Sequence, residues 1–309
     1  MTVTLHLVTR IALATCNFHP ELAEDDVPVL EALRKHDGVE AVAAIWDDPD
    51  VDWSSFDLVV LRSTWDYSSR REEFLAWATS VPRLLNPAGL VEWNTDKSYL
   101  RELADASLPT IPTIWLDPAR NLSSRAVHTR MPAHGDFVIK PTVSRGSRDT
   151  GRYEAGEAHS RGLAIRHAVE LLKDERHVMV QPYLTQVDTE GESVLVYIDG
   201  EFSHSVRKGA MLQGPFRGMA GLYKQEEMSD REATDAERAV ADRVVAHARE
   251  VLHRVSDEQE LLYARVDLVP GNDGEPVVIE FEVAEPSLFL SFKPGAAEKL
   301  AEAILARLA

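Results

Sequence analysis

The chain has 309 residues and a formal net charge of −18, from 33 Lys and Arg against 51 Asp and Glu. This charge argues against a nucleic-acid or anionic-membrane partner, because phosphate-rich partners select basic surfaces. The single cysteine, Cys16, excludes an intramolecular disulfide framework and a Cys-based zinc site. No long apolar span and no signal-peptide pattern occurs, so we expect a cytoplasmic protein without a membrane partner.

The first 93 residues alternate strand-like and helix-like apolar patterns, which predicts a small α/β domain. The apolar run at 58–61 lies between acidic and polar residues and is typical of a parallel strand covered on both faces. The other elements expected in this domain are strands at 10–15 and 39–46 and a helix at 24–35.

Two further lobes are predicted, over residues 94–181 and 182–309. In the first lobe we expect helices at 96–106 and 160–173 and strands at 136–140 and 177–181. In the second we expect strands at 192–198 and 201–207, a helix at 230–254, a hairpin over 263–283 and a helix at 295–308. The predicted fold class is therefore α/β, with α+β lobes around a cleft.

Acids alternate with apolar residues in the predicted hairpin. Strand side chains alternate between faces, so Glu280 and Glu282 point the same way, and the turn signal at 270–274 brings Asp267 alongside them. Three carboxylates on one face repel one another unless a cation lies between them, and oxygen ligands suit a hard ion such as Mg²⁺. The hairpin predicts a magnesium site; the alternative is a solvated strand face.

A lysine and a small polar loop follow the strand at 136–140. Lys140 stands at the strand end, where a desolvated ammonium can meet a phosphate oxygen, and the loop at 143–151 can fold backbone N–H groups over a phosphate chain. The loop has neither Walker A nor GxGxxG order, and alone it is more simply a connection. Lys97 stands at a helix start, where a cation is unfavourable to the helix dipole. Taken alone, it is more simply a solvated surface lysine.

At 179–184 an apolar strand is followed by an extended segment that contains a proline. Its exposed backbone N–H and C=O groups are able to read the edge of a purine. The alternative is an ordinary strand exit.

Taken in order, these motifs resemble the ATP-grasp superfamily of carboxylate–amine ligases. The resemblance implies an N-terminal α/β domain before two ATP-grasp lobes that hold ATP between them. Two lysines hold the phosphates, the loop at 144–147 closes over them, adenine meets the segment at 181–184, and an acid after it meets the ribose. The implied nucleotide-binding residues are Lys97, Lys140, Ser144, Arg145, Gly146, Ser147, Gln181, Pro182, Tyr183, Leu184, Asp188 and Glu190.

The same resemblance implies the catalytic and metal-binding groups. Lys140, Lys208 and Arg265 face the triphosphate or the developing acyl phosphate. Asp267, Glu280 and Glu282 ligate magnesium, with two ions expected and Mn²⁺ as the alternative metal. Many members of the superfamily end this hairpin with Glu-x-Asn, whereas this chain has Glu280-Phe281-Glu282; glutamate still ligates magnesium.

Four segments are similar to the branch that contains the D-cycloserine biosynthesis cyclo-ligase: 61–67, 140–144, 148–150 and 285–289. Within them, Arg62 is expected to clamp a substrate carboxylate and Asp66 to hold an ammonium. The alternative is that this segment only packs between lobes. Glu285 and Ser287 complete the substrate candidates.

The resemblance implies an ATP- and magnesium-dependent ligase that converts an amino-acid-like carboxylate to an acyl phosphate and forms a C–N bond. The nucleophile is either internal, as in cyclisation of an O-ureido-D-serine-like substrate, or a second substrate, as in glutathione synthetase or D-alanine–D-alanine ligase. A non-catalytic ATP-binding protein is the alternative of another class. The predicted partner is a small molecule, and long exposed helices leave room for a homodimer.

Overall fold

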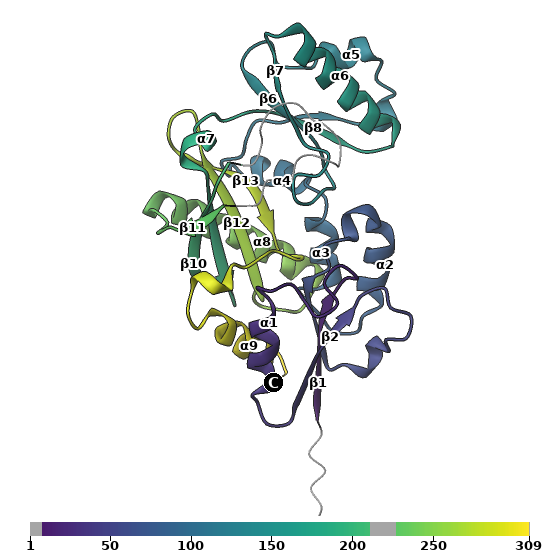
Figure 1. Cartoon of the computed structure of the whole chain (residues 1–309), viewed down its shortest axis with the longest axis vertical. Coiled ribbons are helices and arrows are strands. Elements are labelled where there is room, and N and C mark those ends of the chain that lie inside the picture. Colours follow the sequence, from purple (N-terminus) through teal and green to yellow (C-terminus); the bar gives the residue numbers. More distant parts are fainter. Residues whose placement is uncertain (1–7, 211–226, 309) are drawn as a thin grey trace, which may run out of the picture.

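The computed structural model describes residues 8–210 and 227–308. Its strands form three sheets, each in its own layer of an elongated molecule (Figure 1). None of the helices within residues 8–210 and 227–308 combines the length and the apolar character of a membrane-spanning segment.

The N-terminal sheet is parallel, in the order β2-β1-β3-β4. β3 is buried at every position, as its continuous apolar run predicts. The strands are β1 (Thr9–Thr15), β2 (Val39–Ile45), β3 (Leu58–Ser63) and β4 (Leu84–Leu85), and the helices around them are α1 (Val27–Arg34), α2 (Arg71–Ser80) and α3 (Ala88–Asn94).

The central lobe is an antiparallel sheet in the order β5-β8-β6-β7, at the top of Figure 1. Helices α5 and α6 cover it, and its core forms a cluster of its own that includes Phe137, Tyr153 and Leu171. The elements are α4 (Tyr99–Asp105), β5 (Ile114–Leu116), α5 (Ser124–His128), β6 (Asp136–Pro141), β7 (Gly151–Glu154), α6 (Ala158–Lys173) and β8 (Val178–Pro182).

The third sheet is antiparallel, in the order β11-β10-β9-β12-β13. The predicted hairpin is confirmed as β12 and β13, and α8 begins at a capping box formed by Thr234 and Glu237. The elements are α7 (Val187–Glu190), β9 (Glu192–Ile198), β10 (Glu201–Lys208), β11 (Met228–Asp230), α8 (Asp235–Val255), β12 (Tyr263–Pro270), β13 (Pro276–Glu282) and α9 (Ala296–Ala306).

The last helix returns to the beginning of the chain. α9 packs against α1, and one hydrophobic cluster joins Leu13 and Leu33 of the first domain to Ile198 and Ile304. The N-terminal and C-terminal parts therefore share a core. The outer part of the central lobe has a core of its own, whereas α4 packs with the third sheet, and a cleft lies between the lobe and that sheet.

Candidate active site

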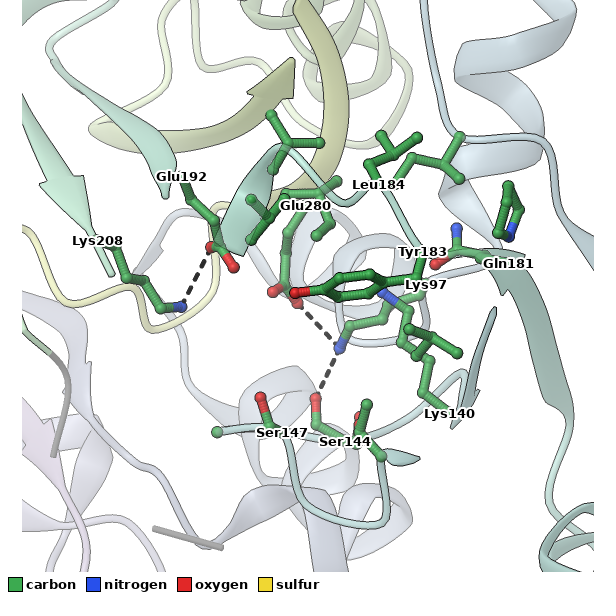
Figure 2. Close-up of a pocket in the computed structure, with 18 residues that line it drawn as sticks. Lys97, Lys140, Ser144, Ser147, Gln181, Tyr183, Leu184, Glu192, Lys208 and Glu280 are labelled. Atoms are coloured by element: carbon green, nitrogen blue, oxygen red, sulfur yellow. Dashed lines mark hydrogen bonds and ion pairs between the residues drawn. The ribbon is translucent and has the colours of Figure 1, made fainter. Parts of the chain in front are cut away.

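A cleft with about 850 Å³ of empty space, including its open mouth, lies between the central lobe and the hairpin (Figure 2). Most of the residues expected to meet the nucleotide line it. They are Lys97, Lys140, Ser144, Gly146, Ser147, Gln181, Pro182, Tyr183 and Leu184, together with Lys208 and Glu280.

Lys97 is buried in this cleft, which decides against a solvated surface position. Its ammonium lies 2.7 Å from the carbonyl oxygen of Ser144 and 3.0 Å from Oε1 of Glu280. Its backbone N–H donates to the carbonyl of Thr142 at 2.9 Å, which fixes the start of α4 against the loop that follows β6. The lysine thus links the loop and the acidic hairpin.

Lys140 comes from the buried strand β6, between β7 and β8 in the sheet. Burial lowers the pKa of its ammonium, and the neighbouring Lys97 and Lys208 lower it further, to about 8, although Glu280 and Glu192 oppose the shift. A third cation, Lys208 at the end of β10, lies 3.5 Å from Glu192 Oε2. Three ammonium groups with little solvent around them favour an anion of high charge.

The other end of the cleft is apolar. Sequence reasoning missed these lining residues because each belongs to an ordinary strand, connection or short helix without a motif: Ile111, Val138, Val187, Val269 and Ile279. At the β8 exit, the N–H of Tyr183 donates to the carbonyl of Asp136 at 2.8 Å. The N–H of Leu184 has no hydrogen-bond partner among the described residues. Apolar side chains next to the N–H of Leu184 form an environment that suits a flat heteroaromatic ring with a hydrogen-bond acceptor on its edge.

The two acids expected to meet a ribose do not line the cleft. Asp188 accepts from Arg152 at 2.9 Å and from the Tyr183 hydroxyl, and Glu190 is exposed at the end of α7. Glu192, two residues later, does line the cleft. Burial raises the pKa of the Glu192 carboxyl, and the nearby Asp267 and Glu280 raise it further.

The acidic hairpin brings Asp267 alongside the glutamates, as the turn signal predicts: Asp267 lies opposite Glu280, and Arg265 lies opposite Glu282. Arg265 donates to both oxygens of Asp267, at 2.7 and 3.0 Å, and to Glu282 Oε1 at 2.7 Å. Burial raises the pKa of Glu282, and the neighbouring Glu280, Glu285 and Asp267 add to the shift, against the opposing charge of Arg265. Burial also raises the pKa of Glu280, but Lys97, Lys140, Arg265 and Lys208 outweigh it and lower this pKa to about 2, so the positive charge around the hairpin stabilises Glu280 and leaves Glu282 less well compensated.

No group of three His, Cys, Asp or Glu side chains has metal-ligand geometry within residues 8–210 and 227–308. In this state Arg265 and Lys97 hold the hairpin acids instead. The donor set still fits magnesium, because carboxylate oxygens are its preferred ligands and an added cation would relieve the repulsion within the cluster.

Two substrate candidates lie away from the cleft. Arg62 is fully buried; its guanidinium donates to Asp26 Oδ1, at 2.7 Å from Nη2, and to the carbonyl of Pro286 at 2.9 Å. Asp66 accepts from Trp46 Nε1 at 2.8 Å and pairs with Arg70 at 2.6 Å. In the structure Arg62 therefore pairs with Asp26 and the segment after β13, and Asp66 pairs with Trp46 and Arg70; the expectation that Arg62 clamps a substrate carboxylate and Asp66 an ammonium stays a prediction.

Arg145 and Glu285 meet each other. Arg145 was expected to contact the nucleotide, but its Nε lies 3.2 Å from Glu285 Oε2 and its guanidinium lies over the ring of Trp65. The next substrate candidate, Ser287, offers its carbonyl to Arg265 at 3.3 Å. The segment after β13 thus lies where the hairpin, the loop after β6 and the N-terminal domain come together.

Known proteins match the chain along nearly its whole length. A family model described as the N-terminal domain of the D-cycloserine synthetase DcsG matches residues 11–86. The cycloserine biosynthesis protein DcsG of Streptomyces lavendulae is 39% identical over 303 residues, which cover 96% of this chain and 98% of that protein. The crystal structure of D-cycloserine synthetase DcsG has a TM-score of 0.84 at 37% identity, covering 97% of this chain and 100% of that one.

More distant structures share the fold. D-alanine–D-alanine ligase from Bacillus anthracis has a TM-score of 0.63 at 16% identity, covering 97% of both chains. An ATP-grasp RimK domain protein from Sphaerobacter thermophilus has a TM-score of 0.65, also at 16% identity, covering 96% of this chain and 100% of that one. The predicted fold is therefore confirmed as ATP-grasp.

Proposed function

This chain belongs to the DcsG family of ATP-grasp ligases, and from that membership we propose that it uses ATP to activate the carboxylate of an amino-acid-like substrate for attack by nitrogen. It is an ATP-dependent carbon–nitrogen ligase. The observation that carries the proposal is the meeting of Lys97, Lys140 and Glu280 in one cleft with an apolar end.

The two ends of the cleft match the two ends of ATP. Adenine would lie against Val138, Leu184 and Ile279 and accept from the free N–H of Leu184. Glu192 would take the place expected of Asp188 or Glu190 at the ribose. The triphosphate would lie between the ammonium groups of Lys97, Lys140 and Lys208, under the loop at 144–147.

A carboxylate is a poor electrophile because its negative charge resists a nucleophile. Transfer of the γ-phosphoryl group from ATP to a carboxylate oxygen releases ADP and gives an acyl phosphate, which has a good leaving group. Lys140, Lys208 and Arg265 would supply fixed positive charge to the transferring group. Asp267, Glu280 and Glu282 would hold magnesium, which when bound neutralises charge on the phosphates.

The nitrogen then attacks the acyl carbon, phosphate leaves and the nitrogen loses a proton. In the relatives named for cycloserine biosynthesis the product is a cyclic compound, so we propose an internal nitrogen in a substrate resembling O-ureido-D-serine. An internal nucleophile is already near the acyl carbon, which removes the entropic cost of bringing two molecules together. Closure of the loop at 144–147 would keep water from the acyl phosphate.

The test is release of ADP and phosphate from Mg-ATP, with O-ureido-D-serine and with D- and L-amino acids, added singly and in pairs. We expect turnover with one substrate alone and a cyclised product by mass spectrometry. Release only with pairs would show an intermolecular ligase instead. ATP binding without release for every substrate would favour the non-catalytic protein.

Variants test the site itself. Lys140→Ala and Glu280→Gln should each reduce phosphate release by at least about 10²-fold, because each removes charge stabilisation at the transferring group. Lys173→Ala, on the exposed end of α6, and Glu275→Gln, on the exposed turn of the same hairpin, are the matched controls. Near-normal turnover in either site variant would disprove the assignment.

A further inference from the structure

Glu285, Trp65 and Tyr67 lie together beside the acidic hairpin and next to Arg145, and we refer to these three residues as a subsite with Glu285 as its floor and the two rings as its walls. Its carboxylate is almost fully buried, with 4% of the residue exposed. The indole N–H of Trp65 donates to the Glu285 carbonyl at 3.3 Å, and the Tyr67 hydroxyl lies close to the carboxylate. Arg145 covers the carboxylate, with its Nε 3.2 Å from Oε2 and its guanidinium carbon 3.9 Å from the Trp65 ring centroid.

The floor and walls are held in place without Arg145. The carbonyl of Pro286 accepts from Arg62, which is itself fixed by Asp26, and the carbonyl of Ser287 accepts from Arg265. His204 contacts the carbonyls of Leu288 and Phe289 through Nε2, at 2.9 and 3.1 Å. Donors from both ends of the chain therefore fix this segment, so the subsite keeps its shape when Arg145 leaves.

Arg145 itself is held less firmly. Its side chain is 27% exposed, and it belongs to the loop whose other members, Ser144, Gly146 and Ser147, line the nucleotide cleft. Its partners in the described chain are Glu285 and the Trp65 ring. A loop arginine over a preformed carboxylate and an indole face occupies a binding place for a cation.

Charge decides what kind of group replaces it. A buried carboxylate is strongly destabilised when it loses its cation, and a neutral ligand group would leave Glu285 unpaired. An ammonium group restores the pair, donates hydrogen bonds to the carboxylate and contacts the indole face. In an α-amino acid the ammonium is only two bonds from the carboxyl carbon, which would then lie toward Arg265 and the hairpin.

We propose that the Glu285–Trp65–Tyr67 subsite binds the ammonium group of the amino-acid substrate and that Arg145 is an internal stand-in which the substrate displaces. This inference rests on the proposed function. Displacement frees the loop at 144–147 from the N-terminal domain, so substrate binding is coupled to the position of the loop over the phosphates. Arg145 is thus a competitor of the substrate in the nucleotide-free enzyme.

The first experiment uses methylguanidinium, a probe that does not depend on the identity of the substrate. Titrated by calorimetry, it should bind Arg145→Ala with millimolar affinity and should not bind the wild-type protein, in which Arg145 occupies the subsite. The double variant Arg145→Ala/Glu285→Gln should also fail to bind. Absence of binding to Arg145→Ala would overturn the proposal.

The second experiment uses O-ureido-D-serine without nucleotide. Because its internal competitor is gone, Arg145→Ala should bind this compound more tightly than wild type, on the order of tenfold, the scale of one charge-assisted hydrogen bond. Arg148→Ala, in the same loop and exposed, should behave as wild type. The N-acetylated compound, which lacks the ammonium, should not bind. Weaker binding by Arg145→Ala would show that Arg145 is a substrate ligand and would overturn the proposal.

Turnover separates the two claims. If wild-type protein releases ADP with O-ureido-D-serine but methylguanidinium does not bind Arg145→Ala, the subsite is wrong and the proposed function stands. If methylguanidinium binds as expected but O-ureido-D-serine supports no turnover, the cation subsite stands and the substrate of the proposed function is wrong.

Discussion

Lys140 has an environment in which its charge depends on pH near neutrality. Its ammonium is buried at the end of β6, near Lys97 and Lys208, and its pKa is lowered to about 8 by burial and by these two cations. Above this pH the free protein loses a positive charge from the part of the cleft that we assign to phosphate. A bound phosphate chain would restore the ordinary preference of a lysine for its charged form.

ATP binding should therefore take up protons. At pH 8 the free Lys140 is about half protonated, and bound phosphate raises its pKa, so binding takes up about half a proton. Below pH 7 the lysine is already charged in the free protein, so the number of protons taken up on ATP binding falls toward zero. Calorimetric titration in buffers of different ionisation enthalpy measures this number.

Lys140→Arg is the matched variant, because arginine stays charged over this whole range. When this variant binds ATP, the number of protons taken up should not increase between pH 7 and pH 8. The same rise in both proteins would assign the proton to another group.

At the residue scale, a local conflict in the sequence marks a residue as unusual, whereas an interaction with a distant partner leaves no such signal. Lys97 at a helix start is unfavourable to the dipole, and the structure gives it Ser144 and Glu280. Arg62 carried no such signal. Its partner Asp26 lies 36 positions away in a stretch with no recognisable motif, and this ion pair becomes visible only after folding.

The side-chain amide of Asn94, at the end of α3, hydrogen-bonds to the backbone at the end of β13. The Asn94 side chain donates to the carbonyl of Phe281 at 2.8 Å, and its Oδ1 accepts from the N–H of Val283 at 2.8 Å. These two residues flank Glu282, so the Asn94 side chain pairs with the backbone there as a neighbouring strand would, and it fixes the orientation of Glu282. The Tyr99 hydroxyl adds a further contact to Phe281 N–H.

Asn94→Asp should destabilise the protein by about 2–3 kcal/mol, because a buried carboxylate oxygen would face the Phe281 carbonyl where an N–H donor stood. The measurement is the free energy of unfolding in urea. Asn121→Asp, an exposed asparagine in a turn, should change it by less than about 0.5 kcal/mol. Equal effects of the two substitutions would contradict the role given to Asn94.

The element scale is where the sequence was most informative. The hairpin and helices α6 and α8 have strong apolar periodicity or turn signals, and their predicted bounds differ from the observed ones by a few residues. The short strands β4, β5 and β7 and the helices α2, α3 and α5 have no comparable local pattern, because they are fixed by contacts with the rest of the chain. The residues at 211–226 lie outside the described ranges, so the connection between β10 and α8 is described only up to residue 210 and from residue 227 on.

At the scale of the whole molecule, the three predicted domains do not each have a separate core. The outer part of the central lobe does: its apolar cluster, from Leu116 to Val180, lies within the lobe, whereas α4 packs into the cluster of the third sheet. The first and last parts of the chain share theirs, through α1 and α9. Sequence periodicity shows that each of these helices has a buried face, but it does not show that the two faces meet.

The central lobe should therefore open more readily than the rest of the protein. In hydrogen exchange monitored by mass spectrometry, the amides of β6, β7 and α6 should exchange faster than those of β1, β9 and β12 in the nucleotide-free protein. Mg-ATP at 100 times its Kd stabilises the bound form by about 2.7 kcal/mol and should slow exchange in the lobe about 10²-fold. Lys140→Ala should lose this protection. Protection confined to other elements would contradict the placement of ATP against this lobe.

The packing of α9 on α1 has a consequence for synthesis on the ribosome. The parallel sheet of the first domain is made early, but Leu33 on α1 is covered by a cluster that includes Leu300 and Ile304. Until those residues emerge from the ribosome, that apolar face stays open to solvent, to chaperones and to proteases. The domain that is translated first is thus completed last, and a truncated product that ends before α9 would be recognised by the exposed apolar surface it cannot bury.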